Sequence, residues 1–185
     1  MPTEIDTHKN KNYKGRNARL LKEWDLIDKR FSNNKQIKYV VSKTNEVNLP
    51  IAYDIIFNMK SIIGVEEPDA QGLQKPVFGH EHIMRITLPN NYPAADGSPE
   101  FKFLTDIWHP NIRYFGSFRG RVCLNISGYG VYTPLVDYID RVAGYLTYEL
   151  YHAKYEAPYP EDLDVAEWVI TQAEPQNWIP FKQHN

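Results

Sequence analysis

The sequence predicts an α+β domain in which one helix comes first, several strands follow and further helices end the chain. Two kinds of apolar pattern support this order. Near the start, and again after Pro134, apolar residues recur at the spacing of an amphipathic helix. Between these regions lie short segments rich in β-branched and aromatic residues, separated by turn residues, and such segments are typical of strands.

The first helix is predicted to begin at Arg16, with Asn17 as its N-cap. Its apolar stripe consists of Leu20, Trp24, Ile27 and Phe31. The charged residues of the opposite face, which we interpret as solvated, are Arg19, Lys22, Glu23, Lys29 and Arg30. Residues 1–15 are polar and show no periodic pattern, so they are predicted to form a mobile tail before a domain of residues 16–172.

Four strands are predicted ahead of the only cysteine. They cover residues 37–41, 51–59, 77–88 and 100–107. Residues 61–64 form either a short strand of their own or the end of the second strand. Turn-forming residues separate the segments, and strands that follow one another in this way favour a meander.

The stretch 108–125 contains the residues with the clearest chemistry. Cys123 is the only cysteine of the chain, and a cysteine thiolate is a strong nucleophile. Asn111 offers a neutral amide donor, which can stabilise an oxyanion. Pro110 stiffens the backbone between His109 and Asn111. We therefore predict an active-site loop here.

Helices are predicted after this loop. Apolar residues at helical spacing indicate a helix over residues 135–150, and residues 157–162 then break it. A last helix is expected over residues 164–171, with Val165, Trp168 and Val169 on its buried side. Residues 173–185 are predicted to be an irregular tail that packs partly on the domain.

Composition excludes several classes of function. The chain has 185 residues and a net charge of −2, which gives no electrostatic case for binding nucleic acid. A single cysteine cannot form an internal disulfide or a multi-cysteine zinc site, and it suits a reducing compartment. The sequence shows no membrane-spanning run and no signal peptide, so we expect a cytoplasmic protein with no membrane partner and no cofactor.

Two segments of the active-site loop resemble the signature of E2 ubiquitin-conjugating enzymes. They are His109-Pro110-Asn111-Ile112 and Gly120-Arg121-Val122-Cys123-Leu124-Asn125. The turn 89–93 and the loop 157–162 are similar to further parts of that family. The resemblance implies a UBC-like fold: an N-terminal helix, a four-stranded antiparallel meander sheet, an active-site loop and C-terminal helices.

The resemblance also implies a reaction. Cys123 would accept ubiquitin or a ubiquitin-like protein from an E1 activating enzyme as a thioester, and would pass it to a lysine of a protein substrate. Asn111 would stabilise the oxyanion or order the loop, and His109 would hold the loop by hydrogen bonding, beside Pro110. Leu124 and Asn125 complete the motif.

The family's acidic loop gives roles to three further residues. Asp162, with Glu161 next to it, matches the position that helps the incoming lysine lose its proton, although a solvated loop acid is an equal alternative. Tyr159 replaces the usual asparagine and would line the path of the lysine. In the first helix, Arg16, Arg19 and Lys22 would dock the E1, unless they are simply solvated.

Two departures from the family pattern affect partners. Ala94 stands where many E2 enzymes have a phenylalanine that docks RING-type ligases, so an E3 of that type is not expected. Residues 113–119 lengthen the segment between Asn111 and Cys123, and this insertion either folds away from the site or reshapes its groove. Both departures fit a system without a RING ligase, such as the compact ubiquitin-like operons of bacteria, including antiphage defence.

Three alternative functions stay open. The first is a non-catalytic E2 variant that only binds a ubiquitin-like protein. The second is a cysteine hydrolase that uses Cys123, His109 and Asn111. The third is a metal site at His80 and His82, which would share a strand face, although two surface histidines are the better interpretation.

Overall fold

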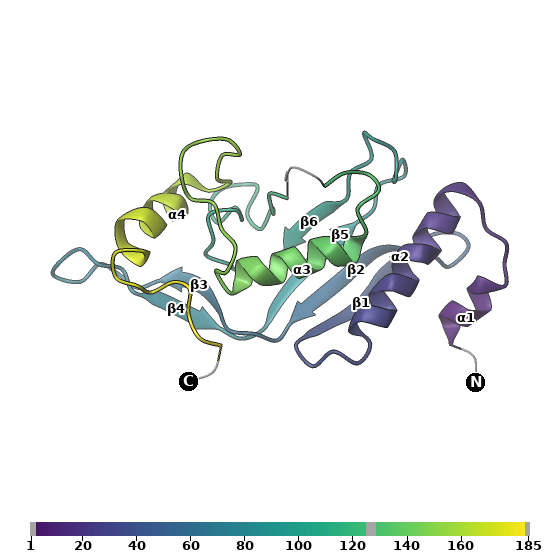
Figure 1. Cartoon of the computed structure of the whole chain (residues 1–185), viewed down its shortest axis with the longest axis horizontal. Helices are drawn as coiled ribbons and strands as arrows, with labels where there is room; N and C mark the ends of the chain where they lie inside the picture. Colours follow the sequence, from purple (N-terminus) through teal and green to yellow (C-terminus); the bar gives the residue numbers. More distant parts are fainter. Residues whose placement is uncertain (1–2, 125–128, 184–185) are drawn as a thin grey trace.

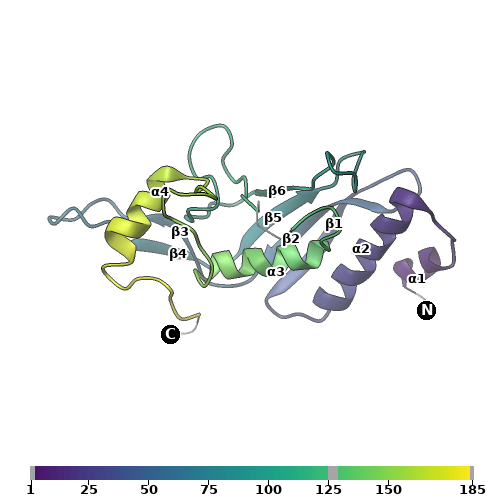
Figure 2. The same cartoon turned by 45° about the horizontal axis from the view of Figure 1, so that its top comes forward.

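A computed structural model describes residues 3–124 and 129–183 of the chain. Two helices, α2 and α3, lie along one face of a central sheet (Figure 1). At one end of the molecule a short helix, α4, covers a smaller sheet near the C-terminus, and at the other end α1 lies beside α2 (Figure 2). Within the described residues, none of the helices combines the length and the apolar character needed to cross a membrane.

Helix α2 (Gly15–Phe31) is the first long element. Its predicted apolar stripe is confirmed, because Leu20, Trp24, Ile27 and Phe31 are all buried. The predicted cap is wrong: the residue at the N-cap position is Lys14. Asn17 lies inside the helix, where its side chain accepts a hydrogen bond from the amide of Asn45 at 3.1 Å and so connects α2 to the turn after the first strand.

The prediction of a mobile tail over residues 1–15 is wrong for α1 (Glu4–Lys9). This helix has no apolar stripe. A capping box between Thr3 and Asp6 stabilises its start instead. Ile5 belongs to the main hydrophobic core, and Lys9 forms an ion pair with Asp25 of α2 at 2.8 Å. These contacts hold α1 against α2.

The predicted four-stranded antiparallel sheet is confirmed, with strand order β1-β2-β5-β6. The strands are β1 (Ile37–Thr44), β2 (Pro50–Phe57), β5 (His82–Thr87) and β6 (Glu100–Phe103). One predicted strand was drawn too long, since residues 77–88 are two strands separated at residues 80–81. The first of them, β4 (Pro76–Gly79), pairs with β3 (Ser61–Val65) in a separate hairpin.

The predicted C-terminal helices are present as α3 (Leu135–Leu146) and α4 (Leu163–Trp168), and a π-helical turn, η1 (Val169–Ala173), extends α4. The main core lies between α2, α3 and the sheet. A second hydrophobic cluster lies at the α4 end. The C-terminal tail packs on this second cluster: Trp178 stacks on Trp168, with ring centroids 6.1 Å apart, and Phe181 meets Phe78 at 5.0 Å.

Candidate active site

A short antiparallel ladder brings Asn111 and Cys123 together. The Cys123 N–H donates to the Asn111 carbonyl oxygen at 2.9 Å. One step further along, the Arg113 N–H donates to the Arg121 carbonyl at 2.8 Å, and the Gly120 N–H donates to the Arg113 carbonyl at 2.7 Å. Residues 113–119 therefore form a closed loop, and Asn111 and Cys123 lie opposite each other at its base.

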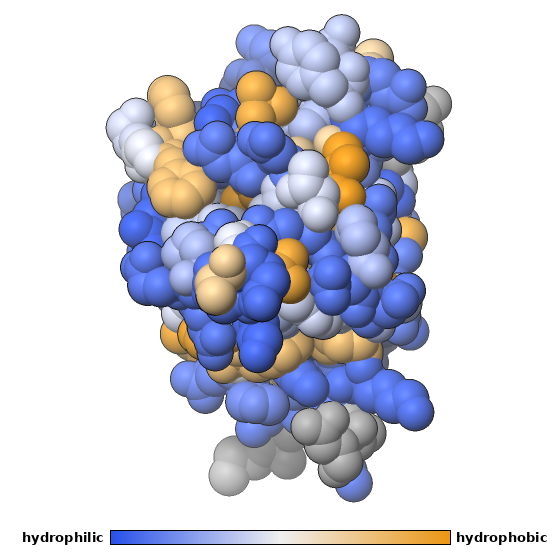
Figure 3. Space-filling model, turned by 90° about the vertical axis from the view of Figure 1, so that its left-hand side faces the viewer, coloured by the Kyte–Doolittle hydropathy of each residue, from blue (hydrophilic) through white to orange (hydrophobic). Residues whose placement is uncertain are grey.

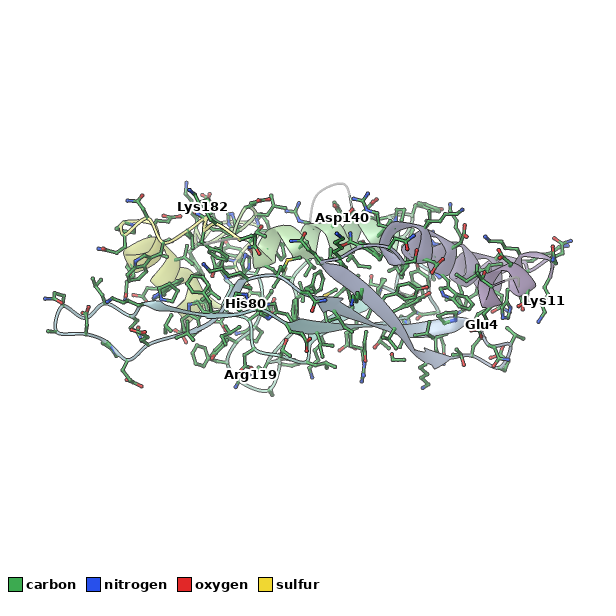
Figure 4. The ribbon with its side chains drawn as sticks, turned by 90° about the horizontal axis from the view of Figure 1, so that it is seen from below. Glu4, Lys11, His80, Arg119, Asp140 and Lys182 are labelled. Carbon is green, nitrogen blue, oxygen red and sulfur yellow. The ribbon has the colours of Figure 1, made fainter. Side chains whose placement is uncertain are left out.

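This loop packs on the segment that precedes the His-Pro-Asn turn. Tyr114 and Phe115 pack edge-on against Trp108, with centroids 4.7 and 5.8 Å away. Arg119 forms an ion pair with Asp106 at 2.6 Å. Arg119 lies on a loop that projects on the side of the molecule opposite Lys182 (Figure 4). Residues 113–119 are not among those that line the groove described below, which favours the first of the two alternatives left open by the sequence.

His109 is a buried, neutral support of the loop. Its Nδ1 accepts the Asn111 N–H at 3.1 Å, so the proton is on Nε2, which donates to the Leu150 carbonyl at 3.0 Å. Burial lowers the pKa of His109 to about 3. The ring also stacks on Tyr145, at 4.8 Å between centroids. Because neither ring nitrogen is free, His109 cannot take a proton from Cys123, which weighs against a cysteine hydrolase.

The side chain of Asn111 holds the segment that follows α3. Its Oδ1 accepts the His152 N–H at 2.9 Å, and its Nδ2 donates to the His152 carbonyl at 3.3 Å. The side chain is buried beside the half-buried Cys123. An asparagine amide has two N–H groups, and His152 takes one of them. This geometry supports the loop-ordering role and leaves one donor for an oxyanion.

Asp162 is a buried structural residue, and this corrects the prediction of a carboxylate that receives the proton of the lysine. Its Oδ2 accepts the N–H groups of Tyr114 and Phe115 at 2.8 and 3.2 Å. Its Oδ1 accepts the Val165 N–H at 3.3 Å and so caps α4. With 2% of its surface exposed, Asp162 cannot reach a substrate amine without losing these bonds.

Glu161 contributes to the same attachment. Its Oε1 lies 3.5 Å from Arg113 Nε and 3.4 Å from Arg121 Nε, one arginine from each side of the ladder. The Asp162 N–H also donates to the Pro110 carbonyl at 3.0 Å. Together, residues 161–162 fasten the inserted loop and the His-Pro-Asn turn to the start of α4.

The remaining predicted residues are Tyr159, Leu124 and Asn125. Tyr159 is exposed, and its ring meets that of Tyr155 at 5.0 Å. The Cys123 carbonyl accepts a hydrogen bond from the Tyr145 hydroxyl at 3.3 Å. Leu124 is half-buried, whereas Asn125 lies outside the described residues.

A groove of about 470 Å³ runs beside Cys123. One wall is the turn 92–99, which includes the exposed Ala94, and the other is the segment 129–133. Val122 and Leu124, on either side of the cysteine, also line it. Ala94 is thus one of the residues that line this groove.

The basic residues of α2 differ in exposure. Arg19 donates to the Thr133 carbonyl at 3.2 Å and to Glu23 at 2.6 Å, and Arg16 donates to the Pro89 carbonyl at 3.2 Å. Lys22 is the exposed residue of the three. The guanidinium groups of Arg16 and Arg19 thus serve the fold itself.

The prediction that Glu23 lies on a solvated face is wrong. Glu23 is 1% exposed and also accepts hydrogen bonds from the Tyr92 hydroxyl at 3.0 Å and from the Leu135 N–H at 2.9 Å. It connects α2, the turn after β5 and the start of α3. Glu23 lies beside Leu20, Trp24 and Ile27 of the apolar stripe on the helix, and this position could have indicated that Glu23 is buried.

The two histidines considered as metal ligands do not share a strand face. His82 begins β5, is buried and bonds through Nε2 to the Met59 carbonyl at 3.0 Å, whereas His80 lies before the strand and is exposed. Across residues 3–124 and 129–183, there is no group of three or more metal-ligating side chains.

Comparison with known proteins gives a consistent result. A family model described as ubiquitin-conjugating enzyme matches residues 56–163, more than half of the chain. Over 51 residues, the chain is 39% identical to ubiquitin-conjugating enzyme E2-22 kDa of Drosophila melanogaster and to ubiquitin-conjugating enzyme E2 K of Homo sapiens. These alignments span 28% of this chain and only 23% of either relative.

Among solved structures, human ubiquitin-conjugating enzyme E2 G1 is 18% identical to the chain. The superposition covers 70% of this chain and 93% of that one, with a TM-score of 0.45.

Proposed function

Because the chain belongs to the ubiquitin-conjugating enzyme family, we propose that it carries ubiquitin or a ubiquitin-like protein as a thioester on Cys123 and transfers it to an amine. The observation that carries this proposal is the bond between the Cys123 N–H and the Asn111 carbonyl. It keeps a nucleophile and a neutral hydrogen-bond donor together although a loop of unusual length separates them in the sequence.

The proposed reaction has two acyl transfers. In the first, the Cys123 thiolate attacks the thioester that an E1 activating enzyme holds, and the E1 cysteine leaves as a thiolate. In the second, an amine attacks the Cys123 thioester, the nitrogen loses a proton to solvent, the tetrahedral oxyanion collapses and the Cys123 thiolate leaves. The remaining N–H of the Asn111 amide is our candidate for stabilising that oxyanion, a contribution of about 10²–10³ in rate for such a donor.

Proton removal from the amine is not assigned to His109 or Asp162, because both are buried and fully hydrogen-bonded. We assign Asp162 and Glu161 a positioning role instead. They attach the ladder that carries Cys123 to α4, beside the exposed Tyr159, which lines the approach of the amine in this proposal.

The partners of the reaction follow from the proposed chemistry. They are an E1, a ubiquitin-like modifier and a lysine-bearing protein substrate, in the cytoplasm, where a free thiol stays reduced. Among the basic residues of α2, the exposed Lys22 is the candidate for E1 contact. Ala94, which stands where many E2 enzymes have a docking phenylalanine, supports a system that works without a RING ligase.

The test is an assay for the thioester. The protein is incubated with E1, ubiquitin and ATP, and with other E1 and modifier pairs, and is then run on non-reducing gels. We expect a band that is heavier by one modifier, that disappears on thiol treatment and that Cys123→Ala does not form. Cys123→Ser should give an adduct that resists thiol, because it is an oxygen ester.

Failure to form this band with the E1 that charges the cognate modifier would contradict the proposal. Binding of the uncharged modifier by the same folded protein would then support the non-catalytic variant.

A further inference from the structure

An apolar groove of about 260 Å³ runs along the outer side of α4, and the active-site geometry does not use it. Its principal walls are Tyr155, Pro160, Leu163, Ala166, Glu167 and Ile170. Three of the apolar side chains are largely exposed, namely Tyr155 (76%), Leu163 (51%) and Ile170 (42%). On the face of the molecule at this end, hydrophobic side chains appear among hydrophilic ones (Figure 3).

Tyr155, Leu163 and Ile170 are not part of the hydrophobic core. Val165, Trp168 and Val169 form the buried side of α4 and η1, where they join the second hydrophobic cluster. Leu163, Glu167 and Ile170 follow helical spacing on the opposite side. Grouped apolar side chains that remain exposed, with polar residues around them, are typical of an interaction site.

Carboxylates outnumber lysines and arginines among the wall residues of the groove and their immediate neighbours in the sequence. Glu167 lines the groove, and the exposed Glu156 and Asp164 are next to its wall residues Tyr155 and Leu163. Across the described part of the chain, none of these three carboxylates takes part in an ion pair. Lys154 is the basic residue in the same loop. The complementary partner is therefore a basic segment that carries an apolar side chain.

The segments that form the walls of the groove are hydrogen-bonded to the active-site loop. Pro160, in its wall, precedes Glu161 and Asp162, and the Asp162 N–H donates to the Pro110 carbonyl at 3.0 Å. The loop that carries Tyr155 starts after His152, whose backbone is held by the Asn111 side chain. A segment bound in the groove would thus lie along the elements that support Cys123.

We propose that this groove binds the lysine-rich segment of a protein substrate. An apolar side chain of the segment sits between Tyr155, Leu163 and Ile170, and its lysines face Glu156, Asp164 and Glu167. This inference rests on the proposed transfer to an amine and names the class of substrate that the transfer uses.

Binding is tested first without any E1 or modifier. Fluorescein-labelled peptides with two central leucines are titrated by fluorescence polarisation, one with lysines on both sides and one with glutamates. The lysine peptide is expected to bind and to weaken as salt is raised, because the rim charges are solvent-exposed. Glu167→Lys and Ile170→Asn should each weaken it about fivefold or more.

The matched controls change similar residues away from the groove. Glu46→Lys alters an exposed carboxylate, and Val40→Asn alters an exposed apolar side chain of β1. Neither should change peptide affinity. Equal binding of the glutamate peptide, or unchanged affinity in both groove variants, would overturn the proposal. So would a dimer in sedimentation that Ile170→Asn dissociates, because the groove would then be an interface between copies.

A second assay separates this inference from the proposed function. The Cys123 thioester is discharged either to free lysine or to the lysine peptide. Groove variants should form the thioester and discharge it to free lysine at the wild-type rate, while transfer to the peptide falls about fivefold or more. If no thioester forms, the proposed function fails and peptide binding alone decides the groove. If the thioester forms normally and transfer to the peptide is unchanged in Glu167→Lys, the groove proposal fails alone.

Discussion

The backbone of Cys123 donates a hydrogen bond to the backbone carbonyl of Asn111 at 2.9 Å, across the base of a loop closed by its own ladder. The distance between these residues along the chain therefore says little about their distance in space. The inserted residues pack on Trp108 and are fastened by Asp162, so they lengthen the loop without separating the two functional residues.

Gly120→Ala should damage this ladder more than Gly116→Ala. Both glycines have positive φ, but a Cβ at Gly120 would lie 2.2 Å from the Phe103 carbonyl oxygen, whereas a Cβ at Gly116 meets nothing within 4 Å. We expect a loss of about 2–3 kcal/mol for Gly120→Ala and about 1 kcal/mol for Gly116→Ala in urea unfolding. Equal losses would show that the close approach to β6 is not what fixes Gly120.

Asn111→Ala should affect more than the second acyl transfer. Removing the amide leaves the half-buried His152 backbone groups without two hydrogen bonds, which we expect to cost about 1–3 kcal/mol in unfolding free energy. Single-turnover kinetics would separate the two roles. A pure oxyanion role slows transfer to lysine only, whereas a role in ordering the loop slows thioester formation as well.

Asp162→Ala should loosen the inserted loop and α4 together. Three backbone N–H groups would lose their acceptor, for an expected cost of about 2–4 kcal/mol. Limited proteolysis should cut between residues 113 and 119 sooner than in the wild type. Asp164→Ala is the control, since this exposed neighbour should change stability by less than about 0.5 kcal/mol.

Glu23→Gln should destabilise the protein although the residue lies on a helix with many exposed charges. The change removes the charged acceptor that Arg19, Tyr92 and the start of α3 share. We expect a loss of about 2–4 kcal/mol by chemical denaturation. Lys22→Gln, one residue earlier and exposed, should stay within about 0.5 kcal/mol of the wild type; a comparable loss there would refute this account.

His109 should make stability depend on pH in the acid range. Its pKa falls from 6.5 to about 3 on folding because burial disfavours the charged ring. Above pH 6.5 the ring is neutral in both states, so stability does not depend on it. As pH falls toward 3, the unfolded chain binds the proton and the folded protein does not, which lowers the unfolding free energy by about 2 kcal/mol at pH 5.

The measurement is urea unfolding between pH 4 and 7 for the wild type and for His109→Gln. The slope of the unfolding free energy against pH is compared, because a general loss of stability in the variant does not change that slope. His82, whose pKa burial also lowers, contributes in the same direction and should remain in the variant. If His109→Gln left the slope of unfolding free energy against pH unchanged, His109 would not be the source of the pH dependence.

Much of the fold could be predicted from local patterns. The apolar stripe of α2 and the alternation of β5 and β6 identify buried faces, because each element has one side in the same core. Residues 61–64 and 77–79 were expected to be extended, but their pairing as the separate hairpin of β3 and β4 escaped prediction because both strands are short. The helix α1 escaped because its capping box, and not an apolar stripe, marks its start.

The roles of residues in the candidate site were harder to predict from the sequence than the fold. The motif pointed to Asn111 and Cys123, and the structure brings their backbones together across one ladder, so their catalytic roles stay predictions. The roles of Asp162 and Glu23 depend on backbone groups that come from distant parts of the chain, at Tyr114 and Leu135. A carboxylate that binds backbone N–H groups looks identical in sequence to one that faces solvent.

The packing of the C-terminal tail has a consequence for biosynthesis. Lys60, at the start of the β3–β4 hairpin, exchanges two hydrogen bonds with the side chain of Gln183, 123 positions later. Since a nascent chain appears from its N-terminus, this end of the molecule stays open while the rest is translated. The half built on α2 and the central sheet can form early, and the half near α4 is completed only after residue 183 has left the ribosome.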